Sequence, residues 1–424
     1  MPQNFNKDRM YYSFCMYGFL KNLNFFEPFL LLFFLEKGFS YLQIGTLYAI
    51  QSMATNILEI PTGIMADAAG RRRTMIFSML SYLLAFPIFY FSQSFAFFVL
   101  AMLCMAAGDA FRTGTHKAMI FEYLKLKGWK DQKVYYYGHT RSWSQLGSAL
   151  SAVIAAGIVF FSGNYRVVFL ASIIPYALDL LLLLTYPREL DGKLKEFRLD
   201  RLGENFSLTI SEFLASMRNP PIIRGVVNSA SYAGYFDALK DYLQPVLKSF
   251  ALSLPLLAFF GDGLGETKKS ALVIGLMYLA IHLLTSRASR YSGRFAEGFK
   301  DLFRPMNITL VLGLLFGMSA GIAYAFGLTP VTIFLFLGLY LIHNLRRPLG
   351  EAYITDTLKS DILASALSTE SQAITLITAV LAPIIGFLAD LWGVGIAVSA
   401  VSAIMLIALP LYRAKLIPPE PGPA

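Results

Sequence analysis

Long apolar runs dominate the chain, and short polar stretches separate them. Each run has about 18 to 25 residues, the length of an α-helix that crosses the hydrocarbon core of a bilayer. We predict twelve such spans, near residues 11–35, 41–65, 74–93, 95–120, 138–162, 165–186, 222–247, 270–288, 305–326, 329–350, 362–388 and 393–412. The short alternating segments typical of a transmembrane barrel do not occur. The pattern therefore predicts an all-α polytopic membrane protein.

One long polar segment, residues 187–221, divides the predicted spans into two sets of six. Its charged and apolar residues alternate at helical spacing, which is typical of an amphipathic helix lying along a membrane interface. We therefore expect an N-terminal six-helix bundle over residues 1–186, an amphipathic cytoplasmic linker over 187–221, and a C-terminal six-helix bundle over 222–424.

Basic residues gather on one side of this topology. If both termini are cytoplasmic, most loop lysines and arginines face the cytoplasm, and the other side receives Lys37, Arg166, Lys248, Lys268 and Lys269. Cytoplasmic loops of membrane proteins carry such an excess of positive charge. We expect a multi-pass protein of a bacterial inner membrane with both termini inside. The net charge of +9 is then a topology signal, and no nucleic-acid partner is expected.

The composition agrees with a membrane protein and excludes several other classes. Hydrophobic residues make up 56% of the chain and charged residues 15%, whereas soluble proteins are about 25% charged. Cys15 and Cys104 both fall in apolar runs and are expected to be buried thiols, not metal ligands or a disulfide. The chain has no phosphate-binding loop of an ATPase and no protease or esterase motif. We therefore expect neither an enzyme nor a cofactor.

A basic turn follows the second predicted span. It places glycine, aspartate, glycine and three arginines at fixed offsets: Gly63, Asp67, Gly70, Arg71, Arg72 and Arg73. These residues resemble the G-x-x-x-D-x-x-G-R-R-K/R loop between the second and third helices of the major facilitator superfamily. Ala68 departs from the family, whose members often carry a basic residue there. The resemblance implies a gating loop that switches the transporter between inward-open and outward-open states. The alternative is a basic turn that only fixes topology.

The resemblance also implies the overall organisation. In the family, two six-helix halves are repeats that work by alternating access, and helices 1, 4, 7 and 10 line a central cavity. Residues 289–294, with the sequence Ser-Arg-Tyr-Ser-Gly-Arg, fall in the expected eighth-to-ninth loop and are interpreted as a degraded copy of the first motif.

Ionisable residues inside the predicted spans are the candidate chemistry, because a charge at membrane depth costs at least a few kcal/mol unless it faces a cavity or a partner. They concentrate on helices 1, 4, 7 and 10. We predict the following substrate-binding residues: Glu27, Arg112, His116, Tyr235, Asp237, Lys240, Asp241 and Arg346. Two alternatives stay open, since Asp237, Lys240 and Asp241 can neutralise one another and His116 can extend towards the headgroups.

Proton coupling is predicted for Glu27, Asp109 and Arg112. Asp109, Arg112 and His116 recur at spacings of three and four, so they share one face of a helix. Arg112 before Gly114 partly resembles the helix-4 arginine motif that the family associates with proton coupling. Asp109 is either a proton carrier or the charge partner of Arg112. Glu27 lies alone among aromatic residues, as expected either of a proton carrier or of a hydrogen-bonded structural carboxylate.

These observations predict a monomeric, proton-coupled secondary transporter that exports a small amphiphilic or zwitterionic solute. Residues 147–157 lack the Gly-Pro pair by which drug/proton antiporters of the family are marked. One alternative is an importer or facilitator of an anionic metabolite or metal chelate held by Arg112 and Arg346. Another is a lipid flippase or a non-transporting receptor with the same fold.

Overall fold

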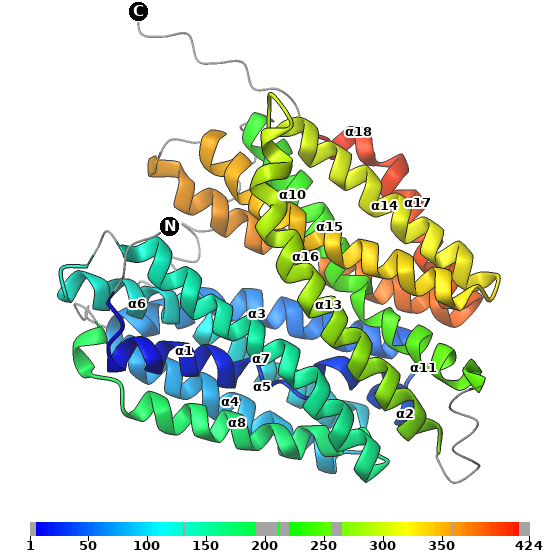
Figure 1. Ribbon diagram of the computed structural model, residues 1–424, viewed down its shortest axis with the longest axis horizontal. Helices are drawn as coiled ribbons and strands as arrows, with labels where there is room; N and C mark the ends of the chain where they lie inside the picture. Colours follow the sequence, from blue (N-terminus) through cyan, green and yellow to red (C-terminus); the bar gives the residue numbers. More distant parts are fainter. Residues whose placement is uncertain are drawn as a thin grey trace, which may run out of the picture. The chain divides into compact units, whose positions relative to one another are not determined.

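The computed structural model describes residues 6–129, 132–191, 211, 220–255, 265–357 and 360–414, and in these ranges its regular structure is helical (Figure 1). The first half contains α1 (Arg9–Lys21), η1 (Glu27–Phe29), α2 (Leu30–Glu36), α3 (Tyr41–Ala69), α4 (Arg71–Phe91), α5 (Phe95–Arg112), α6 (Thr115–Leu126), α7 (Lys133–Ser162), α8 (Val167–Leu184) and η3 (Arg188–Asp191). Most of the predicted amphipathic linker helix over 187–221 lies outside the described residues.

The second half contains α10 (Pro220–Leu239), η4 (Lys240–Tyr242), α11 (Leu243–Ser253), α13 (Glu266–Glu297), α14 (Phe303–Ala325), α15 (Thr329–Thr357), α16 (Ser360–Trp392), α17 (Val394–Ile407) and α18 (Leu409–Tyr412). Within the described ranges, eight helices are long and apolar enough to cross a membrane. Large apolar side chains are strongly exposed on the surface, for example Phe161 at 83% and Phe326 at 79%. Such a surface suits lipid better than water, and the prediction of an all-α polytopic membrane protein is confirmed.

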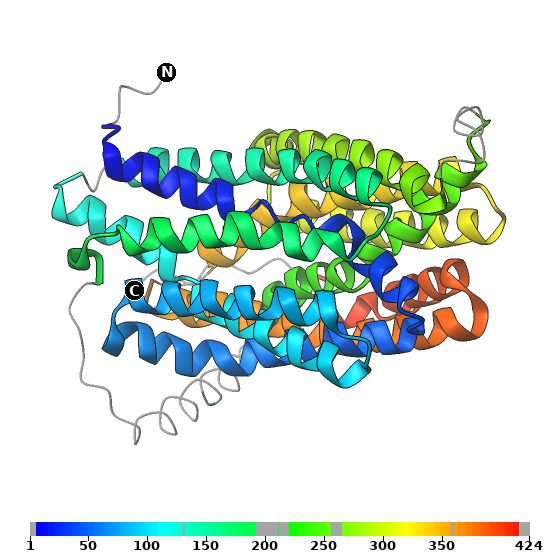
Figure 2. The same ribbon diagram turned by 90° about the horizontal axis from the view of Figure 1, so that it is seen from below.

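Four predicted spans are interrupted, the twelfth of them at Ala408 between α17 and α18, and in this detail the prediction of single helices was wrong. The first span breaks between Lys21 and Glu27, and Figure 2 shows α1 and α2 as two short dark-blue helices joined by non-helical chain. The fourth span breaks at Gly114, whose φ of +72° lies in the left-handed region that favours glycine. The seventh span tightens into η4 just before Pro245, which lacks the N–H that an α-helical turn would use.

The eighth span is longer than predicted. Helix α13 runs from Glu266 to Glu297, so residues 289–294 lie within a helix and not in a loop. Their interpretation as a degraded copy of the loop motif was therefore wrong. The sequence offered no strong helix-ending signal before Gly298, and polar residues at the end of a membrane helix are compatible with continued helix.

The chain forms two compact units, and three of the borders between them lie inside described helices, α3, α11 and α13. Unit 1 comprises Met1–Gly38, Ile50–Glu204 and Ala251–His282, and unit 2 comprises Phe39–Ala49, Asn205–Phe250 and Leu283–Ala424. Helix α3 thus begins in unit 2 and continues in unit 1. Helix α13 begins in unit 1 and continues in unit 2.

Aromatic side chains fill much of the interior of unit 1. The ring of Phe169 on α8 stacks on Phe89 of α4 with centroids 4.7 Å apart, and it meets Phe33 of α2 edge-on at 4.8 Å. Such aromatic pairs each contribute about 0.5–1.5 kcal/mol beyond the area that they bury. This packing holds α2, α4 and α8 together on one side of the charged residues described below.

In unit 2, buried tyrosines pack against glycines of a neighbouring helix. Tyr232 and Tyr235 of α10 lie against Gly313 and Gly317 of α14, where an added Cβ would collide with the tyrosine rings. The hydroxyl of Tyr235 forms a hydrogen bond of 2.6 Å with Oγ of Ser402 on α17. Glycine therefore allows α14 to approach α10 closely enough for the tyrosines to be fully enclosed.

Candidate functional site

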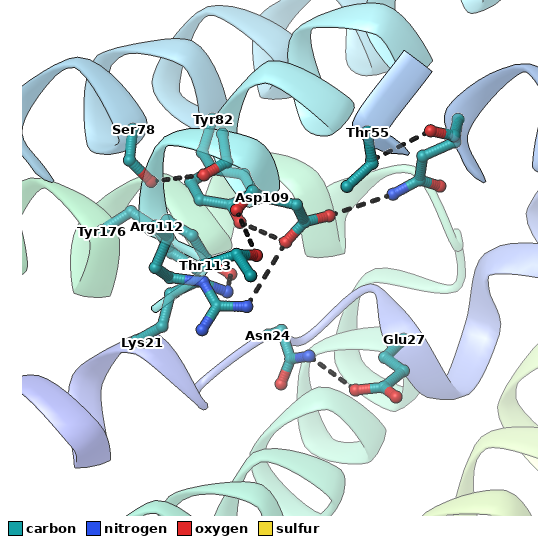
Figure 3. Close-up of polar contacts among 12 residues, drawn as sticks. Lys21, Asn24, Glu27, Thr55, Ser78, Tyr82, Asp109, Arg112, Thr113 and Tyr176 are labelled. Atoms are coloured by element: carbon teal, nitrogen blue, oxygen red, sulfur yellow. Dashed lines mark hydrogen bonds and ion pairs between the residues drawn. The ribbon is translucent and has the colours of Figure 1, made fainter. Parts of the chain in front are cut away.

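Asp109, near the C-terminal end of α5, lies at the centre of a polar network in unit 1 (Figure 3). Its Oδ1 accepts a hydrogen bond of 2.5 Å from the hydroxyl of Tyr82 on α4, and Nη2 of Arg112 lies 3.5 Å from the same oxygen. Its Oδ2 accepts a weaker hydrogen bond of 3.4 Å from Nε2 of Gln51 on α3. The predicted pairing of Asp109 with Arg112 is present in the structure, as their spacing on one helix requires.

Lys21 connects α1 to this network. It is the last residue of α1, and its Nζ donates a hydrogen bond of 3.0 Å to the hydroxyl of Tyr176 on α8. The ammonium also lies 4.6 Å from the ring centroid of Tyr82, at the distance of a cation–π interaction. Figure 3 shows Lys21, Tyr82 and Tyr176 gathered around Asp109 and Arg112. Four helices therefore contribute cations, a carboxylate and aromatic hydroxyls to one cluster.

The Asp109–Arg112 pair is only partly buried. The side chain of Arg112 is 37% exposed and that of Asp109 is 29% exposed. A charge pair that is held by neighbours but open on one side can meet a solute or a water molecule. It also combines both signs of charge within one turn of helix, which suits recognition of a zwitterion.

Glu27 and His116 lie near this network but make other contacts. Glu27, at the start of η1, accepts a hydrogen bond of 2.5 Å from Nδ2 of Asn24. His116 belongs to α6, because the break at Gly114 ends α5 before it, and its ring stacks on Tyr17 with centroids 3.8 Å apart. His116 therefore does not continue the face that Asp109 and Arg112 share.

The predicted residues on the seventh span belong to unit 2. Nζ of Lys240 lies 3.4 Å from Oδ1 of Asp237, and both side chains are about one-third exposed, at 31% and 37%. Asp241 accepts a hydrogen bond of 3.3 Å from Nε2 of Gln244. Tyr235, as described above, is enclosed with its hydroxyl on Ser402. Of these residues, the Asp237–Lys240 pair is the most open to a solute.

Arg346 of α15 is enclosed in unit 2 and is 2% exposed. Its Nη1 donates to the carbonyl of Met306 and, at 2.9 Å, to Oγ1 of Thr309. Its Nη2 donates to the carbonyl of Asn228 at 2.9 Å and to the side-chain oxygen of the same residue. The guanidinium also lies 5.4 Å from the ring centroid of Tyr232. These contacts tie α15 to α10 and α14, and the substrate role of Arg346 stays a prediction.

The basic loop after α3 is attached to the end of α8. Gly70 adopts a φ of +99° and precedes α4, whose first turn is capped when Oδ1 of Asp191 accepts from the N–H of Arg72 at 2.8 Å. The guanidinium of Arg72 donates to the carbonyls of Leu183 and Leu184 at 3.3 and 2.6 Å. A cation at a helix C-terminus satisfies the last carbonyls and interacts favourably with the helix dipole.

The other residues of the predicted gating loop have fewer described contacts. Nη1 of Arg71 lies 3.9 Å from Oε2 of Glu122 on α6, whereas Gly63 and Arg73 are exposed. The side chain of Asp67 lies outside the part of the chain that the structure describes. The gating role of the loop therefore stays a prediction.

A second copy of the loop motif occurs at the other end of the chain and was missed in the sequence. Gly63-x-x-Ala-Asp67-x-x-Gly70 recurs as Gly386-x-x-Ala-Asp390-x-x-Gly393. Gly393, like Gly70, has a positive φ, at +83°, and caps the next helix. The identical spacing of glycine, alanine and aspartate could have revealed this copy. It was overlooked because no arginines follow Gly393.

Together, the helical architecture, the lipid-suited surface and the charged clusters inside it define a polytopic membrane transporter. The sequence pattern of the Major Facilitator Superfamily matches residues 12–347, and the chain belongs to this family. A relative from Bacillus subtilis (strain 168), the uncharacterized MFS-type transporter YxaM, is 32% identical over 90 residues. That match covers 21% of this chain and 23% of the relative.

Solved transporters share the fold. A mutant of the nucleoside transporter NupG matches with a TM-score of 0.74 at 14% identity, over 95% of this chain and 100% of the other. The peptide transporter POT in complex with sulfate matches with a TM-score of 0.70 at 13% identity, over 97% and 96% of the two chains. At these identities the similarity concerns the fold and not the substrate.

Proposed function

We propose that this transporter moves a small amphiphilic or zwitterionic solute by alternating access, couples that movement to protons, and works as a monomeric exporter. The observation that carries the proposal is the partly open Asp109–Arg112 pair, held by Tyr82 and Gln51 at membrane depth. Charges within a membrane span are costly and mark substrate or proton pathways. A paired carboxylate and guanidinium offer both a proton-linked group and a binding group.

The substrate class follows from the side chains that the solute would meet. In unit 1 these are the Asp109–Arg112 pair and the tyrosine hydroxyls beside it. Unit 2 by itself presents a similar pair, Asp237–Lys240. Each pair presents an anion and a cation about one helical turn apart or less, so a solute with both charges can replace each partner in turn. Aromatic rings around Lys21 supply apolar contact for the remainder of an amphiphilic solute.

The experiment is a ligand screen followed by transport. Zwitterionic, anionic and amphiphilic solutes are first ranked by their effect on the thermal stability of the purified protein. The stabilising solutes are then tested in proteoliposomes that contain a pH dye. We expect solute addition to move protons, with solute accumulating on the side that export predicts. Solute movement that is indifferent to an imposed pH gradient would refute proton coupling.

A second candidate function has its own observation. Lys21 and Arg112 bring two cations to the same cluster, although a single carboxylate, Asp109, contacts the guanidinium there. This excess of positive charge favours an anionic metabolite, which an importer or facilitator would take up. In the same screen, stabilisation by anionic solutes and not by zwitterions would select this function over the first.

The membrane orientation is part of the proposal. The positive-inside distribution supports a cytoplasmic position for both termini and the 187–221 segment in a bacterial cell. Epitope tags at residue 2, within 187–221 and after residue 424 should therefore be inaccessible from outside intact cells. Labelling of any of the three tags before the membrane is permeabilised would refute the orientation.

A further inference from the structure

The carboxylate of Asp179 has an environment unlike that of the other acidic side chains in unit 1. Asp179 lies on the buried face of α8 and is 0% exposed. Neither of its carboxylate oxygens has a hydrogen-bond partner among the described residues. An ionised carboxylate without donors is expensive to enclose in a protein at membrane depth. Such a group is either neutral or balanced by a nearby cation.

The two acidic residues that the sequence singled out for proton coupling have donors. Asp109 accepts hydrogen bonds from Tyr82 and Gln51 and forms an ion pair with Arg112, and Glu27 accepts a hydrogen bond from Asn24. Hydrogen bonds and a neighbouring cation stabilise the charged form of a carboxylate. Asp179, for which the described residues provide no such donor, is better suited to gain and lose a proton.

Lys21 is the cation that can respond to the charge of Asp179. Its ammonium lies on the hydroxyl of Tyr176, which precedes Asp179 by three residues on the same buried face of α8. Residues three apart on a helix are neighbours on its surface. Tyr176 and Asp179 therefore lie on one side of α8, and the ammonium contacts the first of them. Lys21 and Arg112 are the two cations whose charges act on that carboxylate.

The other titratable groups nearby are tyrosines, which are neutral near neutral pH, and the carboxylates Glu27 and Asp109, which have hydrogen-bond donors of their own. The titratable and charged side chains around Asp179 and its neighbour Tyr176, from α1, η1, α4, α5 and the chain that includes α8, are Tyr17, Lys21, Glu27, Tyr82, Asp109, Arg112, Tyr176 and Tyr186. On α7, which also packs on α8, His139 and Arg141 are exposed and do not face this enclosed group. Arg112 is already paired with Asp109, so Lys21 is left to balance Asp179.

We propose that Asp179 is the residue at which the transporter binds and releases its coupled proton, with the ammonium of Lys21 as its exchangeable partner. This inference rests on the proposed proton coupling. When Asp179 is protonated, its carboxyl group is neutral and Lys21 stays on Tyr176. When the carboxyl O–H bond breaks, the proton passes to water on the side of the membrane to which the transporter is then open. The ammonium of Lys21 moves to the new carboxylate. The step involves no oxidation or reduction and no further reactant.

The movement of Lys21 between Tyr176 and Asp179 would also change other contacts in unit 1. Lys21 ends α1, and the non-helical residues 22–26 follow it, so the end of α1 is not held by a continuous helix. The ammonium also lies over the ring of Tyr82, whose hydroxyl donates to Asp109. Movement of Lys21 towards Asp179 therefore changes contacts of α1 and of the Asp109–Arg112 pair together. A coupled transporter requires such a link between protonation and conformation.

The first test needs no solute. The purified full chain in lipid nanodiscs is stepped through pH while the infrared C=O stretch of protonated carboxyl groups is recorded. We expect a titrating band that is lost in Asp179→Asn and kept in Asp109→Asn. Asp179→Glu retains a carboxyl group and should keep a titrating band at a shifted frequency. A band that survives in Asp179→Asn, or that is lost only in Asp109→Asn, overturns the proposal.

The partner role of Lys21 has its own measurement in the same preparation. Lys21→Gln removes the cation that balances the anion, so the band should persist to higher pH than in the wild type. If Asp179→Asn fails to fold, the titration of the band in Lys21→Gln still tests the proposal. A titration that is unchanged in Lys21→Gln removes Lys21 from the mechanism.

The second test measures coupling with a solute from the stability screen. In proteoliposomes, Asp179→Asn should still exchange solute at equal pH on both sides but lose accumulation driven by a pH gradient. If the variant accumulates solute like the wild type, the assignment of Asp179 fails while the proposed function stands. If the wild type shows no pH-driven accumulation, the proposed function fails, and the infrared result alone decides whether Asp179 exchanges a proton.

Discussion

The carboxylate of Asp390, near the C-terminal end of α16, accepts hydrogen bonds of 2.8 Å from the backbone N–H groups of both Tyr41 and Leu42. These groups belong to the first turn of α3, where no acceptor within the helix is available. One turn before Asp390, Gly386 lies against the carbonyl of Tyr41 so closely that a Cβ would collide with it. A carboxylate and a glycine of the second G-x-x-A-D-x-x-G copy thus dock α16 onto the start of α3 in unit 2.

Asp390→Ala is expected to lower the stability of the protein. Loss of a side chain that caps a helix N-terminus costs about 0.5–2 kcal/mol, and the negative charge adds a favourable interaction with the helix dipole. The midpoint of thermal unfolding in detergent measures the effect. Asp390→Asn keeps one acceptor oxygen and should lose less. Glu297→Gln, an exposed change at the end of α13, is the control, and a midpoint of Asp390→Ala equal to it would contradict the capping role.

Arg346→Lys should be far more damaging than Arg347→Lys, although the two arginines are adjacent. Arg346 is enclosed and donates to four oxygens, which a lysine ammonium cannot reach together. Arg347 is 58% exposed and only meets Glu351 at 3.9 Å. Disrupting the contacts of an enclosed charge costs about 3–5 kcal/mol, whereas exposed pairs contribute about 0–1 kcal/mol. Unfolding midpoints and purified yield of the two variants provide the comparison, and equal losses would disprove the structural role of Arg346.

Asp109 and Arg112 should behave as one unit in a double-mutant cycle. Asp109→Asn and Arg112→Gln each leave the partner charge unbalanced, so the double variant should be more stable than the sum of the two effects predicts. Contacting charged residues typically show a coupling of about 0.5–3 kcal/mol. The pair Glu122–Lys125, with the lysine 58% exposed, is the matched control at the same spacing. A coupling no larger than in the control pair would mean that the two residues act independently.

Within the basic loop, Arg72→Gln should destabilise the protein and Arg73→Gln should not. The guanidinium of Arg72 satisfies the last carbonyls of α8, whereas Arg73 is exposed. Loss of hydrogen bonds from a charged group costs about 1.5–3 kcal/mol. The unfolding midpoints of the two variants test this difference. Equal midpoints would show that the loop contacts contribute little and would favour the interpretation of the arginines as a topology signal only.

The sequence was sufficient for the fold because a lipid environment requires long apolar helices, and their lengths are visible in the pattern. It was also sufficient for the Asp109–Arg112 contact, because both residues lie on one helix at a fixed spacing. His116 was placed on the same face because the helix was assumed to continue through Gly114. A single glycine in a left-handed conformation ended that face, and such a break depends on packing that the sequence does not state.

Most of the remaining site could not be predicted because its members come from different helices. Lys21 stands alone in an apolar stretch, and nothing near it in the sequence indicates that Tyr82 and Tyr176 would receive its ammonium. Tyrosines on apolar helices are common in protein interiors, and only the packing of α1, α4 and α8 gives these two a polar role. Asp179 carried a sequence signal, an acidic residue in a span, but only the structure shows that none of the described residues donates a hydrogen bond to its carboxylate.

Two of the borders between the two units fall inside α3, between Ala49 and Ile50, and inside α13, between His282 and Leu283. A flexible loop at these places would let one unit pivot while the helices kept their shape. Here, the connecting chain is continuous helix, whose hydrogen bonds resist sharp kinks. Helices α3 and α13 therefore carry an unbroken series of backbone hydrogen bonds across these two borders, and neither helix can be divided there without breaking them.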